Sequence, residues 1–274
     1  MVFGFPRVQS TALEPLYLAN FLLIPLSLAI TLTIRRTEHF SWRLLSAVIG
    51  LGGLTLILTL SRGGYIGFIA SLCVVALASL FKLLQPKIMF GFAGLISVLT
   101  IAVFGVINFS NIGQKSIDEV ERHFVNISQD ASALHRLGSF DYALTAYQSA
   151  PFTGVGIGNF GPFVADYPAV LPHDGWAIVN NAPLEILAET GVFGLFTALA
   201  FLLMLFTLSY KAIFIAKDSA LKAIMLGLVA ACVGVLVQYQ FFSTFYIMHI
   251  WALFGLMIAT QVVIFNQESR HDES

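Results

Sequence analysis

The stretch LKAIMLGLVAACVGVLVQYQF, residues 221–241, decides the fold class, because Lys222 is its only charged residue. A helix that spans a membrane needs about 20 mainly apolar residues, and this stretch supplies them. Six other runs of the chain have the same character. The sequence therefore predicts an all-α, polytopic membrane helix bundle with spans at residues 16–34, 44–60, 64–84, 88–107, 184–208, 221–241 and 245–265.

The composition supports this prediction and excludes several classes of protein. Hydrophobic residues make up 58% of the 274 residues, charged residues make up 11%, and the mean hydropathy is +0.86. A water-soluble fold cannot hide so much apolar surface, so a cytosolic enzyme and a disordered regulator are excluded. The net charge of −1 provides no basic surface for a nucleic acid.

The two cysteines, Cys73 and Cys232, both lie inside apolar runs. We expect both to be buried packing residues. A disulfide or a metal-binding pair is not expected from this placement.

The distribution of Lys and Arg predicts the orientation of the spans. Nine of the 14 basic residues fall on one side of the predicted topology, between spans one and two, three and four, five and six, and in the C-terminal tail. The more basic side is normally cytoplasmic, so the N-terminus is expected outside and the C-terminus inside. No signal peptide is apparent in MVFGFPRVQSTALEP, residues 1–15. Either a short N-terminal tail crosses unaided, or the chain is the C-terminal part of a longer membrane protein.

This topology divides the chain into three parts. Residues 1–107 hold spans one to four, residues 108–183 form one large external loop, and residues 184–274 hold spans five to seven and a cytoplasmic tail. A connection of about 75 residues far exceeds the usual loop length, which favours a functional role. Leu134, Leu137, Leu144 and Tyr147 recur at helical spacing, with Ser128 or Asp130 as a possible cap and Pro151 at the end.

Two arginines on the predicted external side are candidate binding residues. Arg62 lies in Ser61-Arg62-Gly63-Gly64 between spans two and three, and an arginine so close to the hydrocarbon suggests function. The alternative for Arg62 is an anchor to lipid headgroups. Arg136 lies on the loop helix, where the alternative is a solvated surface residue. Two planar guanidinium groups from separate elements suit the binding of a pyrophosphate.

Two further motifs flank the end of the loop. The first, PFTGVGIGNF at residues 151–160, has no βαβ unit beside it, so its glycines favour a tight turn and a close backbone approach over dinucleotide binding. The second, NNAPLEILAETGVFG at residues 180–194, enters span five. Its Glu185 and Glu189 lie four residues apart on one helix face. Carboxylates there are either paired, line a wet cavity or complement the positive end of the helix.

These segments together resemble the O-antigen ligase and O-antigen polymerase superfamily of bacterial multi-spanning glycosyltransferases. Ser61-Arg62-Gly63 matches the family's Ser-Arg-Gly, and Arg136 followed by residues 151–160 matches an arginine before P-x-x-G-x-G-x-G-x-F. The family signature His-Asn-x-x-Leu-x-x-x-x-Glu-x-Gly-x-x-Gly matches Asn181, Leu184, Glu189, Gly191 and Gly194. Two features depart from the family. The chain has fewer spans than most members, and Asn180 stands at the histidine position.

The resemblance implies a reaction and a site. A glycan on undecaprenyl pyrophosphate moves outside the cytoplasmic membrane to the hydroxyl of lipid A-core, another glycan or a protein, and no metal or other cofactor is implied. Arg62 and Arg136 bind the pyrophosphate, with Asn181 and Glu189 as further substrate-binding residues. The catalytic candidates are His173, Asn180 and Glu185.

Asn180 itself cannot be the base, because an amide cannot accept a proton at neutral pH. Another residue must therefore take the proton from the acceptor hydroxyl. His173, next to Asp174 on the same external segment, titrates near neutrality and is the first candidate. Glu185 is the second, since partial burial at the mouth of a span favours the protonated carboxyl. His173 is otherwise an ordinary loop histidine.

Other functions remain open at this point. A protein oligosaccharyltransferase uses the same residues. A transporter of lipid-linked sugars predicts inverted repeats and facing charges within the spans, and the sequence shows no repeat and few such charges. A catalytically inactive protein that binds lipid-linked glycan or acts as a scaffold is favoured by Asn180.

Overall fold

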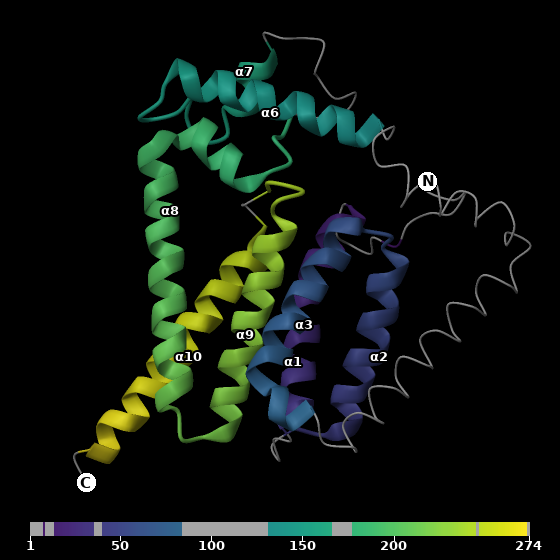
Figure 1. Ribbon diagram of the computed structural model, residues 1–274, viewed down its shortest axis with the longest axis vertical. Helices are drawn as coiled ribbons and strands as arrows, with labels where there is room; N and C mark the ends of the chain where they lie inside the picture. Colours follow the sequence, from purple (N-terminus) through teal and green to yellow (C-terminus); the bar gives the residue numbers. More distant parts are fainter. Residues whose placement is uncertain are drawn as a thin grey trace, which may run out of the picture. The chain divides into compact units, whose positions relative to one another are not determined.

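The computed structural model describes residue 8 and residues 14–35, 40–83, 131–165, 177–244 and 247–272, with the side chains of 80–83, 131–137 and 270–272 excepted. All regular elements in these residues are helices, as predicted (Figure 1). They are α1 (Pro15–Arg35), α2 (Trp42–Leu58), α3 (Arg62–Leu83), α6 (Ala131–Ser149), α7 (Phe160–Ala165), α8 (Ala182–Ile215), α9 (Ser219–Gln238) and α10 (Met248–Asp272).

Five of the described helices, α1, α3, α8, α9 and α10, are long and apolar enough to cross a membrane, and α2 is apolar but shorter. These six helices coincide with six of the seven predicted runs. The predicted span at residues 88–107 lies outside the described residues. The helices indicate a multi-pass membrane protein, whereas the total of seven spans and the three-part division of the chain stay predictions.

The chain divides into two compact units. Within the described residues, unit 1 holds α1, α2, α3, α9, α10 and α8 from Leu205 onward. Unit 2 holds α6, α7, α8 up to Met204 and the segment that starts at Tyr239.

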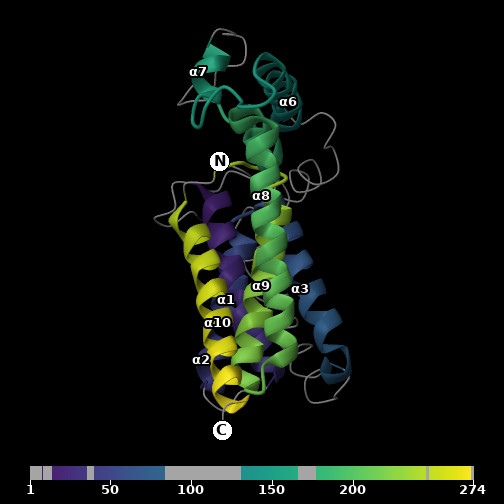
Figure 2. The ribbon, with the colours of Figure 1, turned by 90° about the vertical axis from the view of Figure 1, so that its left-hand side faces the viewer.

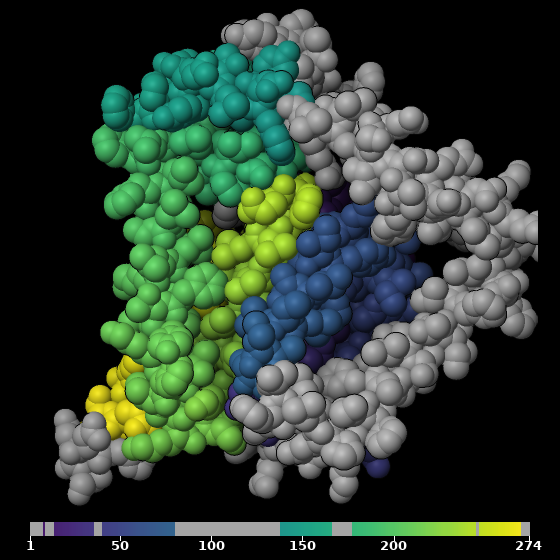
Figure 3. Space-filling model, viewed as in Figure 1, coloured from purple at the N-terminus to yellow at the C-terminus, as the bar shows by residue number. Residues whose placement is uncertain are grey.

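The centre of unit 1 is α9, which packs against α1, α3 and α10 (Figures 1 and 2). Small residues bring α3 and α9 together, and Figure 3 shows the two helices in direct contact. A Cβ on Gly67 would lie 2.6 Å from the carbonyl oxygen of Gly234, and Ser71 Oγ donates to Ala230 O at 2.8 Å. Apolar packing gains little over lipid, so membrane helices rely on such close approaches and on interhelical hydrogen bonds.

Polar contacts join the helices of unit 1 both within α10 and at the end of the unit where α1 and α10 end and α9 begins. Gln261 of α10 donates to Leu205 O at 3.1 Å and contacts Ser209 Oγ at 2.9 Å, which joins α10 to the end of α8. Arg35 donates to Ala78 O at 3.0 Å, and Lys217 pairs with Glu268 at 2.6 Å. The basic residues of this end are those that predict a cytoplasmic side.

The cysteine prediction is half wrong. Cys232 is buried and free, but Cys73 is free and exposed on α3. Its neighbour in the same apolar run, Leu77, exposes 79% of its surface. A hydropathy pattern cannot separate a residue that faces protein from one that faces lipid, because both are apolar.

Unit 2 has its own core, which α6, α7, residues 177–179 and the first turns of α8 build together. Its buried residues are Ala143, Ala146, Phe160, Val164, Ala177, Val179 and Ala188. The prediction of a loop helix is confirmed by α6, which ends at Ser149 just before Pro151. The candidate caps Ser128 and Asp130 lie outside the described residues.

The close contact of α3 and α9 leads to a test of stability. Gly67→Ala places a methyl group against the backbone of Gly234, which cannot move as a side chain can. Overpacking of this kind costs about 1–3 kcal/mol, so we expect the melting temperature in detergent to fall by several degrees. Gly50→Ala is the matched control, since nothing lies within 4 Å of its new methyl group. Equal melting of the two variants would contradict the packing assigned to Gly67.

Candidate functional site

The Ser61-Arg62-Gly63 motif forms the start of α3 in unit 1. Ser61 is the N-cap, since its Oγ accepts the N–H of Gly64 at 3.2 Å and its carbonyl accepts the N–H of Tyr65 at 3.0 Å. The preceding Leu60 has a φ of 49°, an unusual conformation for a bulky residue that costs about 1–3 kcal/mol. The turn thus places Arg62 as the first residue of α3.

The position of Arg62 concentrates positive charge. The N-terminus of a helix carries a partial positive charge, and a guanidinium there adds a full one. Such a pair is unfavourable for the helix alone but favours a bound anion. Gly64 lets this end of α3 approach α1, because a Cβ at Gly64 would lie 2.6 Å from the Cβ of Ala19.

Glu185 accepts more hydrogen bonds than any other carboxylate in the described part of unit 2. It is partly buried, and its Oε2 accepts the backbone N–H of Val179 at 3.0 Å and the hydroxyl of Ser243. Ser243 Oγ in turn accepts the N–H of Asn180 at 3.1 Å. Two segments distant in sequence, residues 179–185 and Ser243, therefore meet at one carboxylate. Its other oxygen, Oε1, has no hydrogen-bond partner among the described residues.

Asn180 adopts a left-handed backbone conformation with a φ of 59°. Asparagine is enriched in this region because its short polar side chain bonds the local backbone. Here Nδ2 of Asn180 donates to Ile178 O at 3.3 Å. The Asn180 side chain is thus engaged with its own loop.

Asn181 is the N-cap of α8. Its Oδ1 accepts the N–H of Leu184 at 3.0 Å, and its Nδ2 lies 3.3 Å from the carbonyl oxygen of Gln240. The N–H of Ala182 donates to Tyr239 O at 2.9 Å, which ties the same two segments together. Asn181 therefore orders the turn, and its role in substrate binding stays a prediction.

The glycine motif at residues 151–160 packs against the first part of α8, as the close-approach interpretation requires. Gly154 has a φ of 67°, and a side chain on it would overlap the backbone of Glu189 and Thr190. Gly191 has a φ of 65° and sits against the backbone of Phe152. This glycine interrupts the regular geometry of α8 two residues after Glu189.

Glu189 contacts the other end of the glycine motif. Its Oε1 accepts the N–H of Phe160, the first residue of α7, at 3.2 Å, and its carbonyl accepts the N–H of Gly156 at 2.9 Å. Glu185 and Glu189 share one helix face, as predicted from their spacing. Among the described side chains neither forms an ion pair, and their hydrogen-bond donors are backbone N–H groups and one serine hydroxyl.

The structure thus brings together Asn180, Asn181, Glu185 and Glu189 in unit 2. Arg62 belongs to unit 1. The backbone of Arg136 lies in α6, but its side chain lies outside the described residues, as does His173. Within the described part of the chain, no three His, Cys, Asp or Glu residues gather to hold a metal ion.

Ser243, which orients Glu185, is not among the site residues predicted from the sequence. The signal was present, because Ser243-Thr244 is a polar pair between two apolar runs. The sequence does not indicate that this pair lies in contact with residues 180–185. Contacts between segments so far apart depend on the packing of the whole unit.

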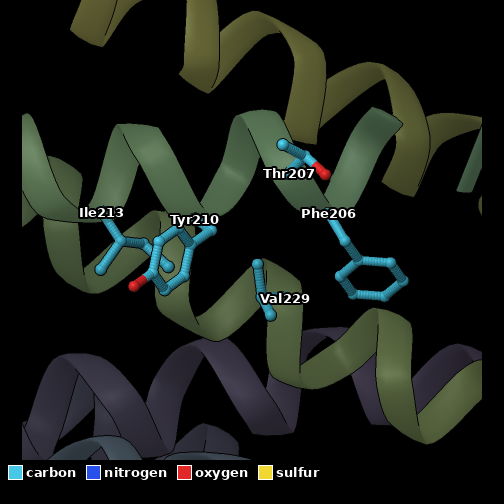
Figure 4. Close-up of a pocket in the computed structure, with 5 residues that line it drawn as sticks. All are labelled: Phe206, Thr207, Tyr210, Ile213 and Val229. Atoms are coloured by element: carbon cyan, nitrogen blue, oxygen red, sulfur yellow. The ribbon is translucent and has the colours of Figure 1, made fainter. Parts of the chain in front are cut away.

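Unit 1 also contains an apolar crevice of about 400 Å³ between α8 and α9 (Figure 4). Four of its lining residues come from α8 and one from α9: Phe206, Thr207, Tyr210, Ile213 and Val229. The rings of Phe206 and Tyr210 border it. Its lining suits a hydrocarbon chain better than a sugar.

Comparison with known proteins matches the motifs to one family. The model of the family described as O-antigen ligase matches residues 45–199, whereas no curated protein matches the chain. The matched region runs from α2 into α8 and contains the Ser-Arg-Gly turn, the glycine motif and the acidic start of α8. Because this region covers more than half of the 274 residues, the chain belongs to the O-antigen ligase family.

Proposed function

We propose that the protein is a metal-independent glycosyltransferase that moves a glycan from undecaprenyl pyrophosphate to an acceptor hydroxyl outside the cytoplasmic membrane. The family match over residues 45–199 carries this proposal, because family membership implies lipid-linked glycan ligase or polymerase activity in general. The multiple apolar helices support the proposal that the substrate is linked to a lipid, which stays in the bilayer during the reaction. The apolar crevice offers space for part of its isoprenoid tail.

The proposed reaction is a displacement at the anomeric carbon. The acceptor oxygen bonds to this carbon, the bond from the carbon to the pyrophosphate oxygen breaks, and the electron pair leaves with the pyrophosphate. Arg62, at the positive end of α3, and Arg136 offset the charge that develops on the leaving group. The acceptor proton passes to a base.

We assign the base to the segment around Asn180. His173 and Glu185 are the two candidates, and the contacts of Glu185 support it as a proton acceptor. Val179 and Ser243 hold one carboxylate oxygen, which leaves Oε1 to face a substrate. Glu189, on the same helix face as Glu185, and Asn181, at the turn before α8, are the proposed substrate-binding residues beside the base.

A second function has one observation in its favour. Asn180 replaces the family's histidine, and its amide is bonded to Ile178 O. A member without a base binds lipid-linked glycan without transferring it efficiently. Transfer assays of the wild-type chain and of the Asn180→His variant separate this binding role from catalysis.

The proposed topology predicts the labelling of introduced cysteines. In a Cys73→Ala, Cys232→Ala background, Arg7→Cys and Lys115→Cys should react with an impermeant maleimide in intact cells, because both positions are predicted to be external. Lys217→Cys, in the loop between α8 and α9, should react only after the membrane is opened. Labelling of position 7 or 115 only in opened cells contradicts the orientation.

The arginine pair predicts a loss of transfer without a loss of insertion. Arg62→Ala and Arg136→Ala should each lower transfer from radiolabelled lipid-linked donor by about a hundredfold, the usual effect of removing a group that stabilises a leaving charge. Lysine variants should also be poor, because a point charge lacks the planar fork. Arg43→Ala, an exposed arginine at the start of α2, is the control. If both alanine variants keep near wild-type transfer, the two arginines do not bind the pyrophosphate and act only as membrane anchors.

The base prediction uses three variants and one control. General-base help is worth about 10²–10⁴ in rate, so His173→Ala or Glu185→Gln should lower transfer by that order, depending on which of them is the base. Asn180→His should raise transfer if the family's base position is merely weakened. Glu268→Gln, in the ion pair with Lys217, should change nothing. If only Asn180→His has an effect, both His173 and Glu185 are wrongly assigned.

A further inference from the structure

Three polar side chains of unit 1 form a hydrogen-bonded chain that the sequence analysis did not single out. Asn20 of α1 and Gln238 of α9 are fully buried, and His249 of α10 is partly buried. His249 Nε2 lies 2.8 Å from Asn20 Oδ1, Asn20 Nδ2 donates to Gln238 Oε1 at 3.1 Å, and Gln238 Nε2 donates to Leu16 O at 3.1 Å. Polar residues within membrane helices are expensive, and by default they indicate function.

The direction of this chain follows from its last member. A backbone carbonyl only accepts, so Gln238 must turn its Nε2 to Leu16 and its Oε1 to Asn20. Asn20 must then donate through Nδ2 and present Oδ1 to His249. The imidazole therefore carries its proton on Nε2, and the lone pair of Nδ1 is left to accept a hydrogen bond. Among the described residues nothing donates to Nδ1.

The surroundings of His249 favour the neutral imidazole. It is the second residue of α10, and it contacts the first turns of α1, where its ring lies edge-on to Phe21 with centroids 5.8 Å apart. Both helix ends carry partial positive charge, which opposes a second positive charge there. A neutral imidazole with a free Nδ1 recognises a hydroxyl and not a phosphate oxygen.

The same end of unit 1 carries Arg62. A Cβ at Gly64 would lie 2.6 Å from Ala19 Cβ, next to Asn20, and one at Gly67 would lie 3.2 Å from Gln238 Cβ. The first turns of the helix that Arg62 begins therefore pack directly against the hydrogen-bonded chain. A ligand that places a phosphate near Arg62 and a hydroxyl near His249 fits this end of the unit.

We propose that His249 binds a hydroxyl of the sugar next to the pyrophosphate of the lipid-linked donor, with Asn20 and Gln238 as positioning residues. This inference rests on the proposed function and adds to it the part of the donor that the bundle recognises. It does not depend on which residue is the base. The site selects a glycosylated lipid over the bare pyrophosphate.

The test compares binding of two lipids to the full chain in detergent, undecaprenyl pyrophosphate carrying one hexose and bare undecaprenyl pyrophosphate. His249→Leu should weaken binding of the first by about tenfold, the loss of one hydrogen bond, and leave binding of the second unchanged. His249→Gln should restore wild-type binding, since an amide donates to Asn20 and accepts from the sugar. Gln261→Leu, which removes another buried polar contact of α10, is the matched control.

The outcomes are distinguishable. If the wild-type chain neither binds nor transfers the glycosylated lipid, the proposed function fails. If it binds this lipid and His249→Leu binds it equally well, the inference about His249 is overturned and the proposed function stands. A glutamine variant as weak as the leucine variant also overturns it, because hydroxyl recognition needs only an acceptor.

The positioning role of Asn20 has a separate readout. Asn20→Asp still accepts the His249 N–H and should keep the preference for the glycosylated lipid, whereas Asn20→Leu should lose it. A purely structural role predicts the reverse order, because a buried carboxylate facing Gln238 Oε1 disrupts the packing more than leucine does.

Discussion

The close approach of α3 and α9 at Gly67 and Gly234 is the contact on which unit 1 depends. In a bilayer, two helices gain almost nothing by exchanging lipid for apolar side chains, so they must come close enough for backbone contacts and for hydrogen bonds such as that of Ser71. This contact fixes the start of α3, where Arg62 lies, relative to the end of α9, where Gln238 lies. Two polar groups that lipid would otherwise reject are thereby held at one end of the bundle.

Unit 2 depends on a different interaction, the pairing of partly buried carboxylates with backbone donors. Glu185 accepts the N–H of Val179, in the turn before α8, and Glu189 accepts the N–H of Phe160, the first residue of α7. A buried carboxylate needs such partners to offset its desolvation. The acidic start of α8 thus organises the turn before it and the glycine motif, and these are the segments that carry the family's signatures.

Hydropathy located the helices of the bundle because the bilayer demands about 20 apolar residues and rejects others. It did so for α1 almost to the residue, and the glycines of residues 151–160 indicated a tight turn and a close backbone approach. It did not show that α8 continues to Ile215 or that Gly191 breaks its geometry, since both depend on neighbouring segments. The hydrogen bonds of Glu185 to Ser243 and of Asn20 to Gln238 and His249 could not be predicted from the sequence either, because their partners lie far apart in the chain.

The left-handed backbone at Asn180 limits which residues this position accepts. Asparagine, aspartate and histidine are the side chains, besides glycine, that most often tolerate such a conformation, whereas β-branched and bulky residues strain it. A histidine at this position would therefore meet the same conformational requirement as the asparagine of this chain. Exchange of Asn180 for histidine would therefore alter the proton chemistry of the loop and leave its backbone path intact.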